Sequence, residues 1–167
     1  MSEGDLCLRL LAAAGFGLVL GLEREALNKP AGLRTHLVVC TAAALLTASS
    51  LALGELLGVP GEALRVAAGV VTGIGFIGAG AILQTRRRVV GLTTAATVFM
   101  SAAIGIAVGA GFYLLAITAT AITIVSNFGL GFLEGRFSKR SAPPIADEEP
   151  RPPRVGRPTS PRAAPER

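Results

Sequence analysis

The ionisable side chains that could do chemistry are concentrated in one segment, positions 23–36. Glu23 and Glu25 are two carboxylates on either side of Arg24, and Mg²⁺ is commonly held by one or two carboxylates together with water molecules. The alternative is that these carboxylates pair with the cations of the segment at a helix end. His36 could take a proton or a metal ion, or be a hydrogen-bonded interfacial residue. The candidate residues of this segment are Glu23, Arg24, Glu25, Lys29, Pro30, Gly32, Arg34, Thr35 and His36.

Glycines and polar residues further along the chain form the second set of candidates. Gly73, Gly75 and Gly78 have the spacing of a dinucleotide-binding motif, but they lie inside an apolar run without the acidic residue expected about 20 positions later. We therefore expect them to serve helix packing or to line a substrate path. The remaining candidates are Gly80 and Arg65 in the same helix, and Gly91, Thr93 and Thr94 at the entry of the next one. The sequence has no nucleophile–base pair and no metal triad, so we expect neither an enzyme nor a cofactor.

The composition indicates that membrane helices position these residues. The chain is 51% hydrophobic and 16% charged, with a mean hydropathy of +0.59, whereas a soluble domain carries about 25% charge. Positions 89–133 carry no charge over 45 residues, which is the length of two membrane spans of about 20 residues each. Further runs cover positions 66–85, 35–54 and 10–22, the last lengthened to position 6 if Arg9 snorkels to the interface. We expect an all-α polytopic membrane protein with five transmembrane helices.

Three glycine pairs have the four-residue spacing that lets helix backbones approach closely in a membrane. They are Gly17 with Gly21, Gly69 with Gly73, and Gly105 with Gly109. Polar residues of the last helix should form hydrogen bonds between helices, and these are Thr118, Thr120, Thr123, Ser126 and Asn127.

The distribution of basic residues predicts the orientation. Lysine and arginine occur at positions 24–34, 86–88 and 136–140, whereas the alternate loops contain only Arg65 or none. Because cytoplasmic loops are the basic ones, the N-terminus is expected outside and the C-terminus in the cytoplasm.

The first four helices could be a duplicated hairpin. Aligning Gly32–Leu45 with Gly91–Ile104 gives six identities in fourteen positions. This pattern favours a parallel repeat, an architecture known among transporters. The alternative is a chance match, because both segments are rich in small residues.

Positions 134–167 differ from the rest of the chain. They contain 8 of the 10 prolines and a net charge of +3 from 8 basic and 5 acidic residues. We expect a transmembrane domain at 1–133 and a disordered cytoplasmic tail at 134–167. The basic residues at the start of the tail would contact anionic lipids, so the positive charge does not require a nucleic acid partner.

Several motifs together resemble the MgtC/SapB family of bacterial inner-membrane proteins. The resemblance covers about residues 5–133, and its motifs are Gly21–Glu25, Lys29–His36, Arg65–Ala68, Gly73–Gly80, Gly91–Ala96 and Ala102–Gly105. Longer members carry a C-terminal ACT-like domain, in place of which this sequence has only the Pro/Arg-rich tail. The sequence therefore resembles a short form of the family.

The resemblance implies a multi-pass protein of the bacterial inner membrane, linked to growth in low magnesium and in some pathogens to virulence. It favours a regulator that acts through helix contacts with a larger membrane complex, the F-type ATP synthase being the suspected partner. The alternative is a transporter for Mg²⁺ or another small solute that works as a homo-oligomer. The lack of carboxylates at positions 66–133 favours the regulator.

Overall fold

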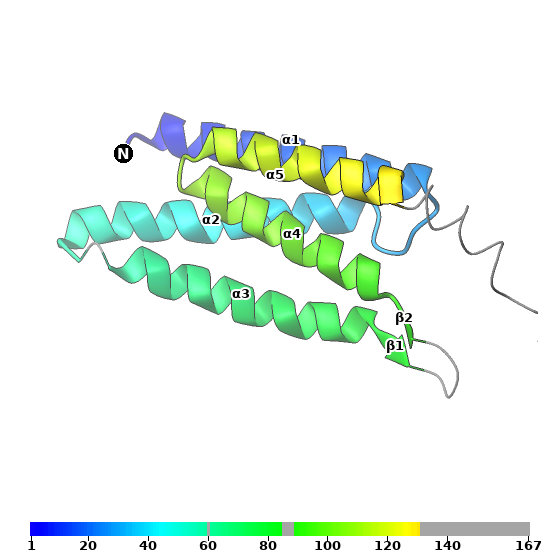
Figure 1. Ribbon diagram of the computed structural model, residues 1–167. Helices are drawn as coiled ribbons and strands as arrows, with labels where there is room; N and C mark the ends of the chain where they lie inside the picture. Colours follow the sequence, from blue (N-terminus) through cyan, green and yellow to red (C-terminus); the bar gives the residue numbers. More distant parts are fainter. Residues whose placement is uncertain (60, 85–88, 131–167) are drawn as a thin grey trace, which may run out of the picture.

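A computed structural model of the protein describes residues 1–59, 61–84 and 89–130 as a bundle of helices (Figure 1). The long helices are α1 (Glu3–Ala26), α2 (Leu33–Leu57), α3 (Glu62–Ala81) and α4 (Leu92–Gly109). Each of these four is long and apolar enough to cross a membrane. A shorter apolar helix, α5 (Tyr113–Val125), continues into one π-helical turn, η1 (Ser126–Leu130). The expected all-α polytopic membrane protein is therefore confirmed, with four full-length helices and a shorter fifth.

Two short strands, β1 (Leu83–Gln84) and β2 (Val89–Val90), pair antiparallel between α3 and α4. The basic residues at 86–88 and the predicted tail at 134–167 lie outside the described residues.

Helix α1 begins earlier than the apolar run indicated, because its polar first turns have specific partners. The Ser2 hydroxyl accepts a hydrogen bond from the Asp5 backbone N–H at 3.2 Å, which caps the helix. Arg9 has partners in α1 and in α4. Its Nη2 lies 3.0 Å from Asp5 Oδ2, and its Nη1 donates to the Gly109 carbonyl at 2.7 Å. The Gly109 carbonyl, at the C-terminal end of α4, thus gives this cation a partner in another helix.

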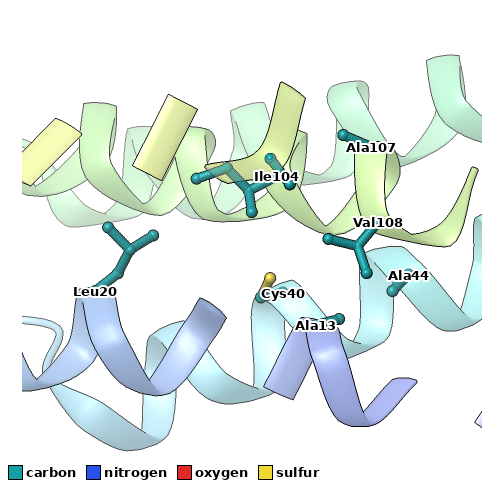
Figure 2. Packing of buried hydrophobic residues seen from close by; sticks show 8 residues of the cluster. Ala13, Leu20, Cys40, Ala44, Ile104, Ala107 and Val108 are labelled. Atoms are coloured by element: carbon teal, nitrogen blue, oxygen red, sulfur yellow. The ribbon is translucent and has the colours of Figure 1, made fainter. Parts of the chain in front are cut away.

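Helix α4 is the central element, since it contacts all four other helices. Helix α3 lies at the edge and contacts α2 and α4. The core formed by α1, α2, α4 and α5 contains few large side chains, as Figure 2 shows. Its buried members are Ala13, Leu20, Cys40, Ala44, Ile104, Ala107, Val108 and Ala116.

Small residues allow the helices to approach closely at two of the three predicted glycine pairs. A Cβ atom added at Gly17 would lie 2.6 Å from the His36 carbonyl oxygen, and one at Gly21 would lie 2.5 Å from the Leu33 Cα. A Cβ atom added at Gly109 would likewise lie 2.6 Å from the Ala44 carbonyl oxygen. Side chains larger than hydrogen are excluded at these positions, so glycine sets the spacing between α2 and both of its main neighbours.

The connections gather at the two ends of the bundle (Figure 1). The α1–α2 connection, the β1–β2 pair and η1 lie at one end, and the N-terminus, the α2–α3 connection and the α4–α5 turn lie at the other. Helices α1 and α3 run in one direction and α2 and α4 in the other, with Gly32 and Gly91 as the N-cap residues of α2 and α4. Successive helices of any up-and-down bundle alternate in direction, so the parallel repeat of a hairpin stays a prediction.

Candidate functional site

Three ionisable side chains are buried at the bundle end that carries the α1–α2 connection. The exposed fraction is 6% for Glu23, 1% for Arg24 and 0% for His36. Burial of a charge is costly unless the charge is paired and hydrogen-bonded. The surroundings of these three residues therefore define the candidate site.

Glu23 and Arg24 of α1 have hydrogen-bond partners in helices that are far away in the sequence. The Asn127 amide Nδ2 donates to Glu23 Oε2 at 3.1 Å, and Arg24 Nη2 donates to the Thr94 hydroxyl at 3.3 Å. Asn127 lies in η1, and Thr94 lies in the first turn of α4. We call Glu23, Arg24, His36, Thr94 and Asn127 the buried polar cluster.

His36 is held by its own helix. Its Nδ1 lies 3.0 Å from the Gly32 carbonyl oxygen, one turn earlier. The backbone of α1 approaches the same turn of α2 at Gly17, which touches the His36 carbonyl. The ring thus has a partner in its own helix, and the backbone of the same residue contacts α1.

The connection between α1 and α2 is short and closed by backbone hydrogen bonds. The N–H of Asn28 donates to the Glu25 carbonyl at 3.0 Å, and the N–H of Lys29 donates to the Arg24 carbonyl at 3.0 Å. Asn28 and Ala31 adopt left-handed backbone conformations with φ of 51° and 57°. This tight course exposes a hollow of about 810 Å³, lined by Glu25, Asn28, Lys29, Pro30, Ala31, Gly32, Leu33, Arg34 and Thr35.

The structure separates the two carboxylates that the sequence brings close together. Glu23 is buried, whereas Glu25 is exposed beside the hollow. The described part of the chain shows no lysine or arginine nitrogen within 4.0 Å of either carboxylate, so neither forms a direct ion pair there, although the charges of Glu23 and Arg24 lie within electrostatic range of each other. It likewise contains no group of three or more His, Cys, Asp or Glu residues that could hold a metal ion. A Mg²⁺ site formed by Glu23 and Glu25 stays a prediction.

The candidate glycines of α3 have different surroundings. A Cβ atom at Gly78 would lie 3.7 Å from Ala95 of α4, whereas one at Gly73, Gly75 or Gly80 would have no neighbour within 4 Å. Gly69 and Gly73 instead line an apolar groove of about 560 Å³ between α2 and α3. Of the α3 candidates, the structure thus brings only Gly78 against another helix. Arg65 is exposed in the second turn of the same helix.

The candidates at the entry of α4 have distinct roles. Gly91 adopts φ of +92° and touches the Ala81 carbonyl, so that the chain can turn from the strand pair into α4. Thr94 points to Arg24, while Thr93 is exposed.

The last helix contributes fewer hydrogen bonds between helices than predicted. Asn127 confirms the expectation by its bond to Glu23. Thr118, Thr120 and Thr123 instead donate to the carbonyls four residues before them in their own helix, at 2.7–2.8 Å. For these three threonines the prediction was wrong, because the local carbonyl satisfies the hydroxyl without a second helix.

Comparison with known proteins connects this site to a family. The MgtC family model matches residues 10–136 of the chain. Putative magnesium transporter YhiD of Escherichia coli K12 is 41% identical over 125 residues, which is 72% of this chain and 58% of the relative. Protein SapB of Bacillus subtilis is 39% identical over 129 residues, or 74% and 56% of the two chains. Protein MgtC of Salmonella typhimurium LT2 is 42% identical over 120 residues, or 72% and 50%.

The chain spans about half the length of the curated relatives it matches. No solved structure matches it. The family match begins within α1, extends past η1 and includes every residue of the buried polar cluster. This multi-pass membrane protein therefore belongs to the MgtC family.

Proposed function

We propose that the protein is an inner-membrane regulator that supports growth in low magnesium by packing its helices against a larger membrane complex. The membrane sector of the F-type ATP synthase is the partner that the family resemblance favours. The observation that carries the proposal is the open glycine surface on α3, at the edge of the bundle. We place the N-terminus outside and the C-terminus in the cytoplasm.

The α3 surface has the properties that helix docking in a membrane requires. A Cβ atom added at Gly69 or Gly73, which lie one turn apart on α3, would meet nothing within 4 Å, and the side chain of Phe76 beside them is 84% exposed. Small residues let a second backbone approach closely, and this gain in packing drives helix association in lipid. At the glycine contacts of α1 and α4 with α2, the space beside each glycine is already filled by α2. Gly69 and Gly73 of α3 are available to another protein.

The first experiment places a large side chain on this surface of α3. In a bacterium that lacks its own MgtC-family protein, a tagged wild-type chain should restore growth in low magnesium and co-purify with the ATP synthase. Gly73→Leu should lose both properties, because the added side chain keeps the partner helix at a distance. Gly15→Leu is the matched control, since Gly15 also has no neighbour within 4 Å but lies on α1. Equal behaviour of the two variants would exclude α3 as the docking surface.

A second candidate function is Mg²⁺ transport, which the name of the E. coli relative favours. It predicts Mg²⁺ influx into liposomes that contain the purified, folded chain and a trapped Mg²⁺ dye. Influx above that of empty liposomes, reduced in a Glu23→Gln/Glu25→Gln variant, would contradict the regulator and support transport through the first cytoplasmic loop. If protein that is inserted in the liposomes gives no Mg²⁺ influx above that of empty liposomes, the result supports the regulator function.

A further inference from the structure

The hollow of the α1–α2 connection is lined by two exposed cations, Lys29 and Arg34. Neither side chain forms an ion pair or a hydrogen bond with any other residue that the structure describes. The hollow also has Glu25 in its lining, so its charges are two positive and one negative. Two cations at the wall of a cavity of about 810 Å³ are thus free to bind an anionic group.

The start of α2 adds to the positive potential of this hollow. Gly32 is the N-cap residue, and the first turn of α2 has neither a side-chain cap nor an acidic residue. Backbone N–H groups at the start of a helix favour a negative charge nearby. Glu25 lies close to this turn, since its Oε2 would be 3.5 Å from a Cβ atom added at Gly32, but it pairs with neither cation of the hollow. The hollow therefore suits an occupant with several carboxylates.

The described part of the chain ends beside the same hollow. Its last residue is Leu130 of η1, and η1 lies at the bundle end that carries the α1–α2 connection (Figure 1). The hydrogen bond from Asn127 Nδ2 to Glu23 Oε2, 3.1 Å long, joins η1 to the last turn of α1, where the connection starts. The chain after position 130 thus starts close to the hollow and on its side of the membrane.

The sequence after position 130 contains one run of acidic residues, Asp147–Glu149, which we call the acidic run. It holds three of the five acidic residues at positions 134–167. Positions 141–150 contain no lysine or arginine, so these ten positions carry three negative charges within a tail whose net charge is +3. The acidic run is therefore complementary in charge to the hollow.

The tether between η1 and the acidic run is long enough to reach the hollow. Asp147 lies 17 positions after Leu130, and an extended chain covers up to about 3.3 Å per residue, or roughly 56 Å in total. Helix α2, the longest of the bundle, has 25 residues and is only about 37 Å long. A short tether also keeps its end at an effective concentration of millimolar order. This concentration offsets the weakness of individual exposed ion pairs.

We propose that the acidic run docks in the hollow of the α1–α2 connection, where its carboxylates contact Lys29 and Arg34. The charge complementarity and the short tether select this segment of the chain as the occupant. The contact covers the connection from within the same molecule, so other anions reach the two cations only when the acidic run leaves. Salt screens charges near the surface, and the contact therefore weakens as the ionic strength rises. The inference is independent of the proposed docking surface on α3 and of Mg²⁺ transport.

The distance between two spin labels on the full chain, measured by electron paramagnetic resonance, tests this contact. In a Cys7→Ser background, in which the remaining Cys40 is fully buried, the labels are attached to Ala26→Cys and Ala146→Cys. Ala26 is exposed at the end of α1, and Ala146 directly precedes the acidic run. In bilayers of phosphatidylcholine at low salt, we expect a short and narrow distance distribution that broadens at high salt.

Neutralising the two cations assigns the docking surface. Lys29→Gln/Arg34→Gln should abolish the short distance. The matched control is Arg86→Gln/Arg87→Gln, which removes two charges from the segment between β1 and β2 and should keep the short distance. A short distance that survives in the first variant, or that is lost in the control, would overturn the assignment to the hollow.

Neutralising the acidic run identifies the occupant. Asp147→Asn/Glu148→Gln/Glu149→Gln should abolish the short distance, whereas Glu134→Gln/Glu166→Gln, which removes the other two acidic residues of the tail, should keep it. A broad distribution in the wild-type chain at low salt, or equal behaviour of these two variants, would overturn the proposal. Loss of the short distance in bilayers that contain phosphatidylglycerol would also overturn it, because anionic lipid head groups would then bind the two cations instead.

Discussion

At the scale of single residues, Arg24 departs furthest from the usual behaviour of its type. An arginine near a helix end commonly extends to the membrane surface, yet only 1% of this side chain is exposed. Its charge lies within electrostatic range of the Glu23 carboxylate, and its Nη2 is bound to Thr94. The two opposite charges compensate each other only while both are present.

Replacing Arg24 by methionine should therefore destabilise the protein strongly. Removal of one partner leaves Glu23 as an uncompensated buried charge, which typically costs about 3–5 kcal/mol. We expect this loss in the free energy of unfolding, measured by denaturant titration in mixed micelles. Arg34→Met is the matched control, because Arg34 is exposed and surface substitutions usually change stability by less than about 0.5 kcal/mol. Equal losses in both variants would contradict the importance of the buried cluster.

The sequence indicates which side chains of the cluster matter but does not indicate their partners. Glu23, Arg24 and His36 stand out because they are ionisable residues beside apolar runs. Asn127 stands out as an amide in a membrane helix. Their pairing is set by tertiary packing, since Arg24 and Thr94 are 70 positions apart and Glu23 and Asn127 are 104 positions apart. No local spacing or periodicity carries that information.

At the scale of elements, contacts to backbone atoms determine how the helices pack. Helix α2 receives Gly17 and Gly21 of α1 along one part of its length, and Gly105 and Gly109 of α4 along another. Each of these glycines meets backbone atoms of α2, which cannot move away as the end of a flexible side chain would. The distances between helices are therefore sensitive to a single methyl group.

A comparison of two alanine substitutions on α1 measures this sensitivity. Gly17→Ala should lower the free energy of unfolding by about 1–3 kcal/mol, because the new methyl group forces α1 and α2 apart. Gly15→Ala, with no neighbour within 4 Å, should be neutral or stabilise by up to about 1 kcal/mol, since alanine favours the helix. Thermal unfolding in detergent, followed by circular dichroism, gives both values. The reverse order would show that α1 does not contact α2 through Gly17.

The number and type of the helices could be predicted from runs without charge, because a lipid core admits few other structures. The start of α1 could not be predicted from the sequence, because the hydrogen-bond partner of Arg9 is a carbonyl of α4. The open surroundings of Gly73 could not be predicted from the sequence either. Two glycines four residues apart have the same spacing in a central helix and in a peripheral one.

At the scale of the whole molecule, the described connections divide between two ends, and the basic α1–α2 connection lies with η1 (Figure 1). The distribution of positive charge predicts that this end is cytoplasmic. Ser2 and Lys29 are exposed residues at opposite ends, and each is suited to carry a label.

The predicted orientation can be measured by cysteine labelling of a Cys7→Ser background, in which the remaining Cys40 is fully buried. Ser2→Cys should react with a membrane-impermeant maleimide on intact spheroplasts. Lys29→Cys should react only after the membrane is permeabilised. Labelling in the opposite order would reverse the orientation, and labelling of both positions on intact spheroplasts would show that the chain inserts in two ways.

The central position of α4 has a consequence for biosynthesis. The ribosome makes α1, α2 and α3 first, so these helices enter the bilayer before the element that contacts all of them exists. Until α4 is translated, the α2 backbone at Cys40 and Ala44, later covered by Gly105 and Gly109, faces lipid or the insertion machinery. A nascent chain that stops after α3 thus exposes an unfinished surface, by which membrane quality control can distinguish it from the complete bundle.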